Sequence, residues 1–259
     1  MGCAQSPRCA AWRQVAQAHP LQLLGEDSIF SRCRTNRSEL CYGEPTLLGL
    51  RMLWTQWPRA CALVPSSVLY DVGAGFGRLS AFLRVHSNAS RVVGLEVDAC
   101  RHAYARGVRE TLWRHLRAAP PLDFRLGDVR ALGFAEATHV LVASQCWREE
   151  LLLDVLRKAL ASSRLECLTL ISRKLPRGWT ARVRALAAAF GDAVAVNFIP
   201  TTYVGASAVY FKRGLRCSAA PRLASARQRC WSPREVEAET ERQAASFLGG
   251  REALLGSEG

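Results

Sequence analysis

The chain of 259 residues has no apolar run long enough to cross a bilayer, because Arg, His or Pro interrupts every candidate segment. It also has no C-x-x-C pair among its ten scattered cysteines, so a structural zinc site is not expected. Cys100 and Cys167 lie in apolar stretches, which predicts small core residues in a reducing compartment. None of the five histidines belongs to a cluster that resembles a catalytic site. The chain is long enough to form one sizeable hydrophobic core.

Acidic residues are scarce relative to basic ones. Lys and Arg number 35 against 22 Asp and Glu, which gives a formal net charge of +13, and nearly all the basic residues are Arg. Such a balance favours an anionic partner, either nucleic acid or an acidic protein surface. It is equally compatible with a compositional bias that spreads Arg over a solvated face. Charge alone therefore does not choose a substrate.

A glycine-rich turn is the most informative feature of the sequence. Residues 67–78 (SVLYDVGAGFGR) form a short apolar run that leads into Gly73, Gly75 and Gly77. Glycines at every second position let the backbone turn sharply and approach a ligand closely. The pattern predicts a buried strand, a ligand-binding turn and a helix. The alternative is an α/β domain in which these glycines only shape a turn.

Carboxylates stand at the ends of three predicted strands. Asp71 precedes the glycine turn, Glu96 ends the strand 91–96, and Asp128 follows the strand 123–127 with Val129 next to it. An acid at the position of Glu96 can accept hydrogen bonds from both hydroxyls of a ribose, and Asp128 can meet the adenine amino group. So many carboxylates suit a cofactor with a sulfonium and an amino group better than one with two phosphates. These residues predict a site for S-adenosylmethionine and resemble the class I methyltransferases that use it.

Apolar periodicity predicts an α/β fold with a mostly parallel, seven-stranded sheet. The remaining strands are expected at 138–144, 165–171, 193–198 and 206–212, and the last two form a terminal antiparallel hairpin. Helices are expected at 45–57, 77–86, 98–116, 148–161 and 179–190. We predict three regions: a basic, loosely ordered arm (1–37), a methyltransferase domain whose N-terminal loop and helix cover the cofactor (38–213), and a basic segment with a C-terminal helix (214–259).

A more specific resemblance begins upstream of the first strand. Residues 42–44 (YGE), the turn 71–77, residues 94–96 and residues 127–128 are similar to the disruptor-of-telomeric-silencing family of histone lysine methyltransferases. In that family the tripeptide belongs to a loop that folds over the cofactor. The resemblance implies cofactor contacts by Tyr42 and Glu44. Thr46, displaced by Pro45, is the equivalent of the threonine that normally follows the glutamate.

The substrate side of the family is matched less completely. Residues 202–211 (TYVGASAVYF) resemble its closing hairpin, which implies that Tyr203 and Tyr210 line a channel for the target lysine. Where the family has Asn-Asn-Phe, residues 143–147 read ASQCW, so Ser144 stands in place of the Asn nearest the transferred methyl and Trp147 can supply an aromatic wall. The resemblance implies a nuclear histone-lysine N-methyltransferase that acts on histone H3 in nucleosomes. Arg-rich flanks at 32–37 and 213–229 would then contact nucleosomal DNA.

Two alternatives stay open. The chain can be a class I methyltransferase for another protein, an RNA or a small molecule, or a catalytically inactive binding module of the same fold. Its first residues, MGCAQS, also satisfy the pattern for myristoylation at Gly2, with Cys3 available for palmitoylation. Two acyl chains would anchor the protein at the cytoplasmic face of a membrane rather than release it to the nucleus.

Overall fold

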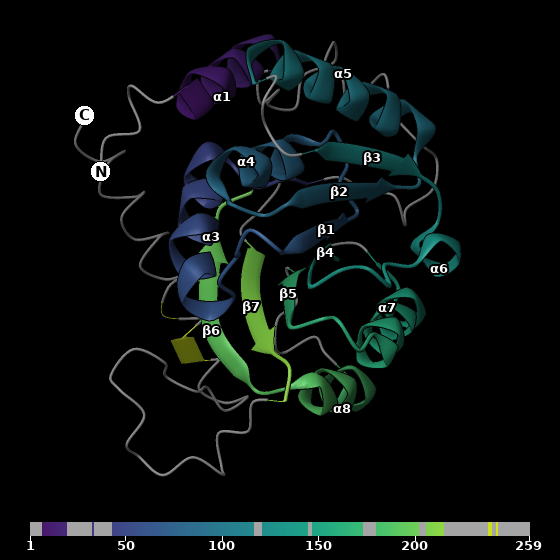
Figure 1. Cartoon of the computed structure of the whole chain (residues 1–259). Helices are drawn as coiled ribbons and strands as arrows, with labels where there is room; N and C mark the ends of the chain where they lie inside the picture. The colour runs from purple at the N-terminus through teal and green to yellow at the C-terminus, as the bar shows by residue number, and fades with distance from the viewer. Residues whose placement is uncertain are drawn as a thin grey trace, which may run out of the picture.

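The computed structural model describes residues 7–19, 33, 43–116, 121–144, 147–172, 180–201, 206–214, 238–239 and 242. Its centre is a seven-stranded sheet with the strand order β3-β2-β1-β4-β5-β7-β6 (Figure 1). The strands are β1 (Val68–Val72), β2 (Arg91–Glu96), β3 (Leu122–Leu126), β4 (His139–Ala143), β5 (Cys167–Ser172), β6 (Ala193–Ile199) and β7 (Ala206–Lys212). β1 to β5 pair in parallel, and β7 lies antiparallel between β5 and β6. The predicted fold class is confirmed.

The central strands are buried along almost their whole length. Every residue of β5 is buried, as are all but the first of β1 and all but the last of β4. Continuous apolar strands of this kind are typical of parallel sheets that are covered on both faces. Two separate clusters of buried side chains lie on the two faces.

Helices cover both faces, and the figure shows how they divide (Figure 1). On one face lie α3 (Leu47–Ala60), α4 (Arg78–His86) and α5 (Ala99–His115). On the other lie α6 (Val129–Leu132), α7 (Glu149–Ala161) and α8 (Ala181–Phe190). The short α6 was not expected from the sequence, because four residues are too few to show a helical period.

Side-chain caps explain why several helices begin where they do. Thr46, Asp98, Asp128 and Thr180 each accept a hydrogen bond from a backbone N–H in the first turn of the helix that follows. α3 therefore begins after Thr46, two residues later than predicted, because Pro45 bridges to Thr201 instead of entering the helix.

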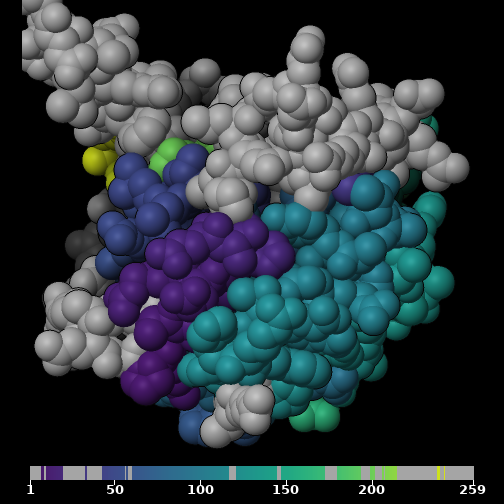
Figure 2. Space-filling view, turned by 90° about the horizontal axis from the view of Figure 1, so that it is seen from above, coloured from purple at the N-terminus to yellow at the C-terminus, as the bar shows by residue number. Residues whose placement is uncertain are grey.

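The N-terminal region differs from the expected loose arm. Residues 7–18 form the helix α1 (Pro7–Ala18), which buries Ala11 and Val15 completely. Trp12 packs edge-on against Phe82 of α4, with 5.3 Å between the ring centroids. Figure 2 shows α1 (purple) lying beside α5 (teal). Apolar residues four apart form the buried stripe, but Arg and Gln between them weaken its periodicity in the sequence. The predicted C-terminal helix falls almost entirely outside the described residues.

The cysteines also differ from expectation. Among the described residues, Cys33 is bonded to Cys100 and Cys61 to Cys167 in two disulfides. Cys167 is a buried core residue, as predicted, but Cys100 is exposed, which corrects the prediction that it lies in the core. Both are covalently paired rather than free thiols. Scattered spacing gave no indication of pairing, because partners 67 and 106 positions apart meet only in the folded sheet. No helix in the described part of the chain is long and apolar enough to span a membrane.

Candidate functional site

The glycine turn lies at the carboxyl end of β1, where it connects to α4. Gly73, Gly75 and Gly77 all have positive φ, at 83°, 56° and 80°. The N–H groups of Gly73 and Ala74 donate to the carbonyl of Leu95 at 3.0 and 2.9 Å, so the turn is joined to the neighbouring strand β2. A Cβ on Gly77 would lie 2.6 Å from the ring of Phe124, which leaves room only for glycine.

Glu96, the last residue of β2, is held directly against this turn. One carboxylate oxygen accepts the N–H of Gly75 at 2.7 Å, and the other accepts the N–H of Asp98 at 2.8 Å. The residue is only 4% exposed. Two charge-assisted bonds to backbone donors fix the carboxylate, as an acid at the end of an apolar strand requires.

Asp71 lies beneath the turn and is completely buried. Its Oδ2 accepts the hydroxyl of Ser80 at 2.6 Å, and Oδ1 has no hydrogen-bond partner among the described residues. Burial raises the pKa of Asp71 to about 7; the Ser80 hydroxyl lowers it, and the nearby charge of Glu96 raises it further. The predicted contact between Asp71 and a cofactor stays a prediction.

Asp128 caps α6 at the carboxyl end of β3. Its carboxylate accepts the N–H of Arg130 at 2.8 Å and pairs with the Arg130 guanidinium. The Arg130 side chain holds the pKa of Asp128 below its ordinary value. Gly127 donates its N–H to the carbonyl of Glu96 at 2.9 Å, so the ends of β2 and β3 meet. Glu96 and Asp128 therefore share the same edge of the sheet, next to the buried Val129.

Three exposed apolar side chains surround these acids, and the sequence analysis missed them. Val97, Leu126 and Leu132 are 47%, 48% and 41% exposed. A Cβ on Gly127 would come within 3.0 Å of Leu132, which places this leucine beside the end of β3. Exposed aliphatic groups next to hydrogen-bonding groups suit a flat base with a polar edge. For Val97 and Leu126, the position directly after β2 and at the end of β3 was the available signal, whereas Leu132 ends the short helix α6.

The segment before α3 reaches the site through an ion pair. Glu44 and Arg78 are both 7% exposed and form a bidentate pair, with the Arg78 Nε donating to Glu44 Oε2 at 3.0 Å. Thr46 caps α3 and donates its hydroxyl to the carbonyl of Pro200 at 3.2 Å. Both residues thus have structural partners, and their cofactor contacts stay predictions. Tyr42 lies outside the described residues.

The end of β4 supplies a side chain on the other flank of the turn. Ser144 is buried, and both its N–H and its hydroxyl donate to the carbonyl of Ile171, at 2.9 and 3.3 Å. The half-buried Trp147 lies against the turn, because a Cβ on Gly73 would be 3.4 Å from its ring. Ser144 fastens β4 to β5 while Trp147 lines the turn.

Tyr210 does not lie where a channel residue is expected, which corrects the prediction. It is 0% exposed, its hydroxyl donates to the carbonyl of Leu53 at 3.1 Å, and its ring meets Trp57 edge-on at 5.9 Å. Its mid-strand position on β7, paired with Thr169, directs it into the core beneath α3. Tyr203 lies outside the described residues.

Arg213 has structural partners, and its expected contact with DNA stays a prediction. Its guanidinium donates to the carbonyls of Ala159, Ser162 and Leu165 at 2.5, 2.7 and 2.5 Å. These bonds satisfy carbonyl groups at and beyond the end of α7. The other Arg residues of the two basic flanks lie outside the described residues.

The hydrogen-bond acceptors at this edge fit an adenosine-containing cofactor. A carboxylate has about four acceptor positions. Glu96 uses one on each oxygen for backbone N–H groups, which leaves acceptors for two ribose hydroxyls. The exposed Val97 and Leu126 flank it, and Asp128 follows at the end of the next strand.

Comparison with known proteins supports the fold and nothing more specific. No protein-family model matches the chain, and no curated protein matches its sequence. Magnesium protoporphyrin IX methyltransferase from Synechocystis PCC 6803, solved with bound SAH, has a similar structure, with a TM-score of 0.52 and 15% identity. That match covers 79% of this chain and 94% of the other.

Two further matches are weaker. The tRNA methyltransferase TrmK of B. subtilis gives a TM-score of 0.49 at 16% identity and covers 70% of this chain and 72% of its own. TrmN from Thermus thermophilus gives 0.47 at 17% identity and covers 62% of this chain. The present chain spans about half of the TrmN chain, 47%. The resemblance to the disruptor-of-telomeric-silencing family therefore stays a prediction. By its strand order and its similarity to the Synechocystis enzyme, the chain has the fold of the class I S-adenosylmethionine-dependent methyltransferases.

Proposed function

We propose that this chain is an S-adenosylmethionine-dependent methyltransferase. The observation that carries the proposal is the position of Glu96, which two backbone N–H groups hold at the end of β2 beside the glycine turn. A carboxylate fixed in this way needs no reorganisation to accept the hydroxyls of a ribose. The cofactor, when bound, supplies a methyl group already activated by its sulfonium. The protein's own work is then to orient and desolvate the reacting groups.

We propose further that the methyl acceptor lies beside Trp147. This ring is half buried, lines the turn at Gly73, and follows the end of β4 at the edge where Glu96 also lies. An aromatic face there can stack on a planar group or attract a cationic amine. The acceptor then belongs to another protein, an RNA or a small molecule.

Histone-lysine specificity is the weaker candidate. It requires an aromatic channel, and one of its two expected members, Tyr210, is a core residue. Tyr42 and Tyr203, the other residues on which the prediction of this specificity rests, lie outside the described part of the chain. Histone H3, nucleosomal DNA and a nuclear location remain predictions from the sequence. So does lipid attachment at Gly2 and Cys3.

Calorimetry with S-adenosylmethionine and S-adenosylhomocysteine tests the cofactor assignment. We expect one site per chain, and no heat of binding would contradict the proposal. Labelled S-adenosylmethionine is then offered with total RNA, a protein extract, a small-molecule extract and nucleosomes in parallel. Label in nucleosomes alone would favour the histone reading over ours.

A variant pair tests the acceptor side. Trp147→Ala should lower the rate of methyl transfer at least about tenfold, because the acceptor loses the aromatic ring that positions it. Its cofactor affinity should change less than about twofold, since Glu96 carries the adenosine contacts. Trp113, an exposed tryptophan 43% accessible on α5, provides the matched control, and Trp113→Ala should leave transfer unchanged. Equal rates of methyl transfer in the two variants would show that Trp147 does not position the acceptor.

A further inference from the structure

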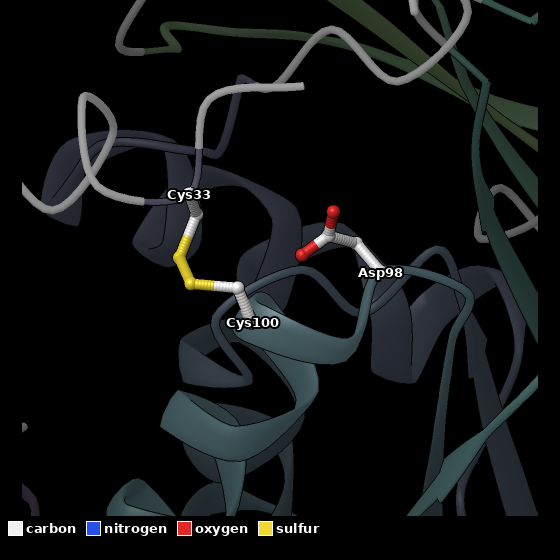
Figure 3. A group of neighbouring side chains, drawn as sticks. All are labelled: Cys33, Asp98 and Cys100. Carbon is white, nitrogen blue, oxygen red and sulfur yellow. A yellow bond between two sulfur atoms is a disulfide. The ribbon is translucent and has the colours of Figure 1, made fainter. Parts of the chain in front are cut away.

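A disulfide is attached to the turn that holds the cofactor-binding carboxylate. Cys33 and Cys100 are 67 positions apart in sequence, and their Cα atoms are 5.5 Å apart. Cys100 lies in the first turn of α5, four residues after Glu96. Figure 3 shows the disulfide and the Asp98 carboxylate at the start of this helix. The sulfur atoms and a carboxylate oxygen of Asp98 lie within 4.8 Å of one another.

Two hydrogen bonds hold the stretch of chain between Glu96 and the first turn of α5, where Cys100 lies. The N–H of Asp98 donates to Glu96 Oε1 at 2.8 Å. The Asp98 side chain in turn caps α5 by accepting the N–H of Arg101 at 2.9 Å. In the sequence, Cys100 lies between Asp98 and Arg101, which form these bonds. A covalent bond at Cys100 therefore restricts the turn whose backbone positions the carboxylate.

The two described disulfides differ in how a thiol can reach them. Cys100 is an exposed residue, whereas its partner Cys33 is only 5% exposed. Cys61 and Cys167 are 3% and 2% exposed, and Cys167 begins β5 at the edge of the sheet opposite the site. Thiol–disulfide exchange requires access of the attacking thiolate to a sulfur atom. The accessible disulfide is thus the one beside the candidate site.

We propose that the Cys33–Cys100 disulfide is a redox-controlled clamp on the cofactor site, so that the oxidised protein binds S-adenosylmethionine more tightly than the reduced one. This inference rests on the proposed function. The reductant is a dithiol: its first thiolate attacks the sulfur of Cys100, the exposed residue of the pair, and releases the Cys33 thiolate, and its second displaces Cys100. Two protons and two electrons pass to the cysteines, and the dithiol becomes a disulfide. Reduction frees the turn, and cofactor binding must then order it again.

The test measures cofactor affinity by calorimetry in buffers of oxidised and reduced dithiothreitol. We expect reduction to weaken S-adenosylmethionine binding about fivefold to tenfold, the usual scale for coupling between two sites. Linkage requires the reciprocal effect. A tenfold ratio means that saturating cofactor makes the midpoint potential of this disulfide about 30 mV more negative. Peptide mapping without reductant should recover Cys33 joined to Cys100.

Cys100→Ser isolates the clamp, because an exposed serine at this position should not disturb folding. The variant should bind the cofactor like the reduced wild type and show no response to dithiothreitol, although Cys61 and Cys167 are still present. Hydrogen exchange gives a readout without cofactor: amides of residues 97–101 should exchange faster after reduction. A redox response that persists in Cys100→Ser would overturn the proposal.

Other outcomes are equally decisive. Equal affinity and equal exchange in the two redox states would refute the clamp and leave the methyltransferase proposal standing. Absence of cofactor binding by the oxidised protein would refute the proposed function first, whatever the exchange data show. Stoichiometric zinc binding by the reduced protein, lost in Cys100→Ser and without a change in cofactor affinity, would make this cluster a metal site instead.

Discussion

Glu96 accepts the backbone N–H of Gly75 at 2.7 Å, so the acid that ends β2 and the turn that follows β1 form one unit. Neither residue could hold this geometry alone. The turn needs an acceptor for its inward N–H, and the buried carboxylate needs donors.

Asp71 should make stability depend on pH. Burial raises its pKa from 3.8 to about 7, so the folded protein favours the neutral acid. The stabilisation from the neutral form is fully present below about pH 4 and is lost as the pH rises through 7. Between pH 5 and 8 the wild type should lose about 2–3 kcal/mol of unfolding free energy relative to Asp71→Asn. Urea unfolding of both proteins at the two pH values measures this, and parallel pH profiles would contradict it.

Gly77 should tolerate no side chain. Its φ is +80°, and a Cβ would lie 2.6 Å from Phe124 and 2.8 Å from Ala105. Gly214 is the matched control, since its φ is +69° but nothing lies within 4 Å of its Cβ position. Gly214→Ala should cost about 1–2 kcal/mol from backbone strain alone. Gly77→Ala should cost about 1–3 kcal/mol more, because the core must move. Equal losses in denaturant unfolding would show that the contact with Phe124 is not tight.

The buried pair of Glu44 and Arg78 should be coupled. Glu44→Gln removes the carboxylate of a buried ion pair, although Arg78 keeps its bond to the carbonyl of His19, and it should lower the unfolding free energy by about 3–5 kcal/mol. The double variant Glu44→Gln with Arg78→Met should recover much of this loss, because no unpaired charge remains. A double-mutant cycle measures the coupling. Additive losses would mean that the two side chains do not interact.

Tyr210 should contribute to stability and not to methyl transfer. Tyr210→Phe removes the hydroxyl that donates to the carbonyl of Leu53, which should cost about 0.5–1.5 kcal/mol of unfolding free energy. Transfer per folded molecule should stay unchanged. A steep fall in transfer with unchanged stability would restore the channel role that the sequence suggested.

Strand positions were predictable because each central strand is a continuous apolar run bounded by polar or turn residues. β2 and β7 begin and end where the sequence placed them. The direction of a side chain was harder to predict. Tyr210 lies in a strand that resembles a channel hairpin, yet alternation along β7 turns it toward α3 and the core.

Features that depend on distant partners could not be predicted. In the sequence, Arg213 is only a basic residue that follows a predicted strand. Its hydrogen bonds to carbonyl groups at and beyond the end of α7 depend on the fold. The bond between Cys33 and Cys100 joins the N-terminal segment to α5, a contact that spacing cannot indicate. The position of Glu96 at the end of β2 was predictable because it ends a continuous apolar run, and its contact with a cofactor stays a prediction. Its two backbone donors became visible only in three dimensions.

The most direct test of the account is cofactor affinity in Glu96→Ala compared with Glu110→Ala, an exposed acid on α5. Loss of hydrogen bonds to a charged acceptor should weaken S-adenosylmethionine by about 1.5–3 kcal/mol in Glu96→Ala and leave Glu110→Ala unchanged. Calorimetry on the oxidised proteins measures both, with near-ultraviolet circular dichroism to show that each is folded. Unchanged affinity in a folded Glu96→Ala protein would contradict the assignment of this carboxylate and the cofactor site built around it.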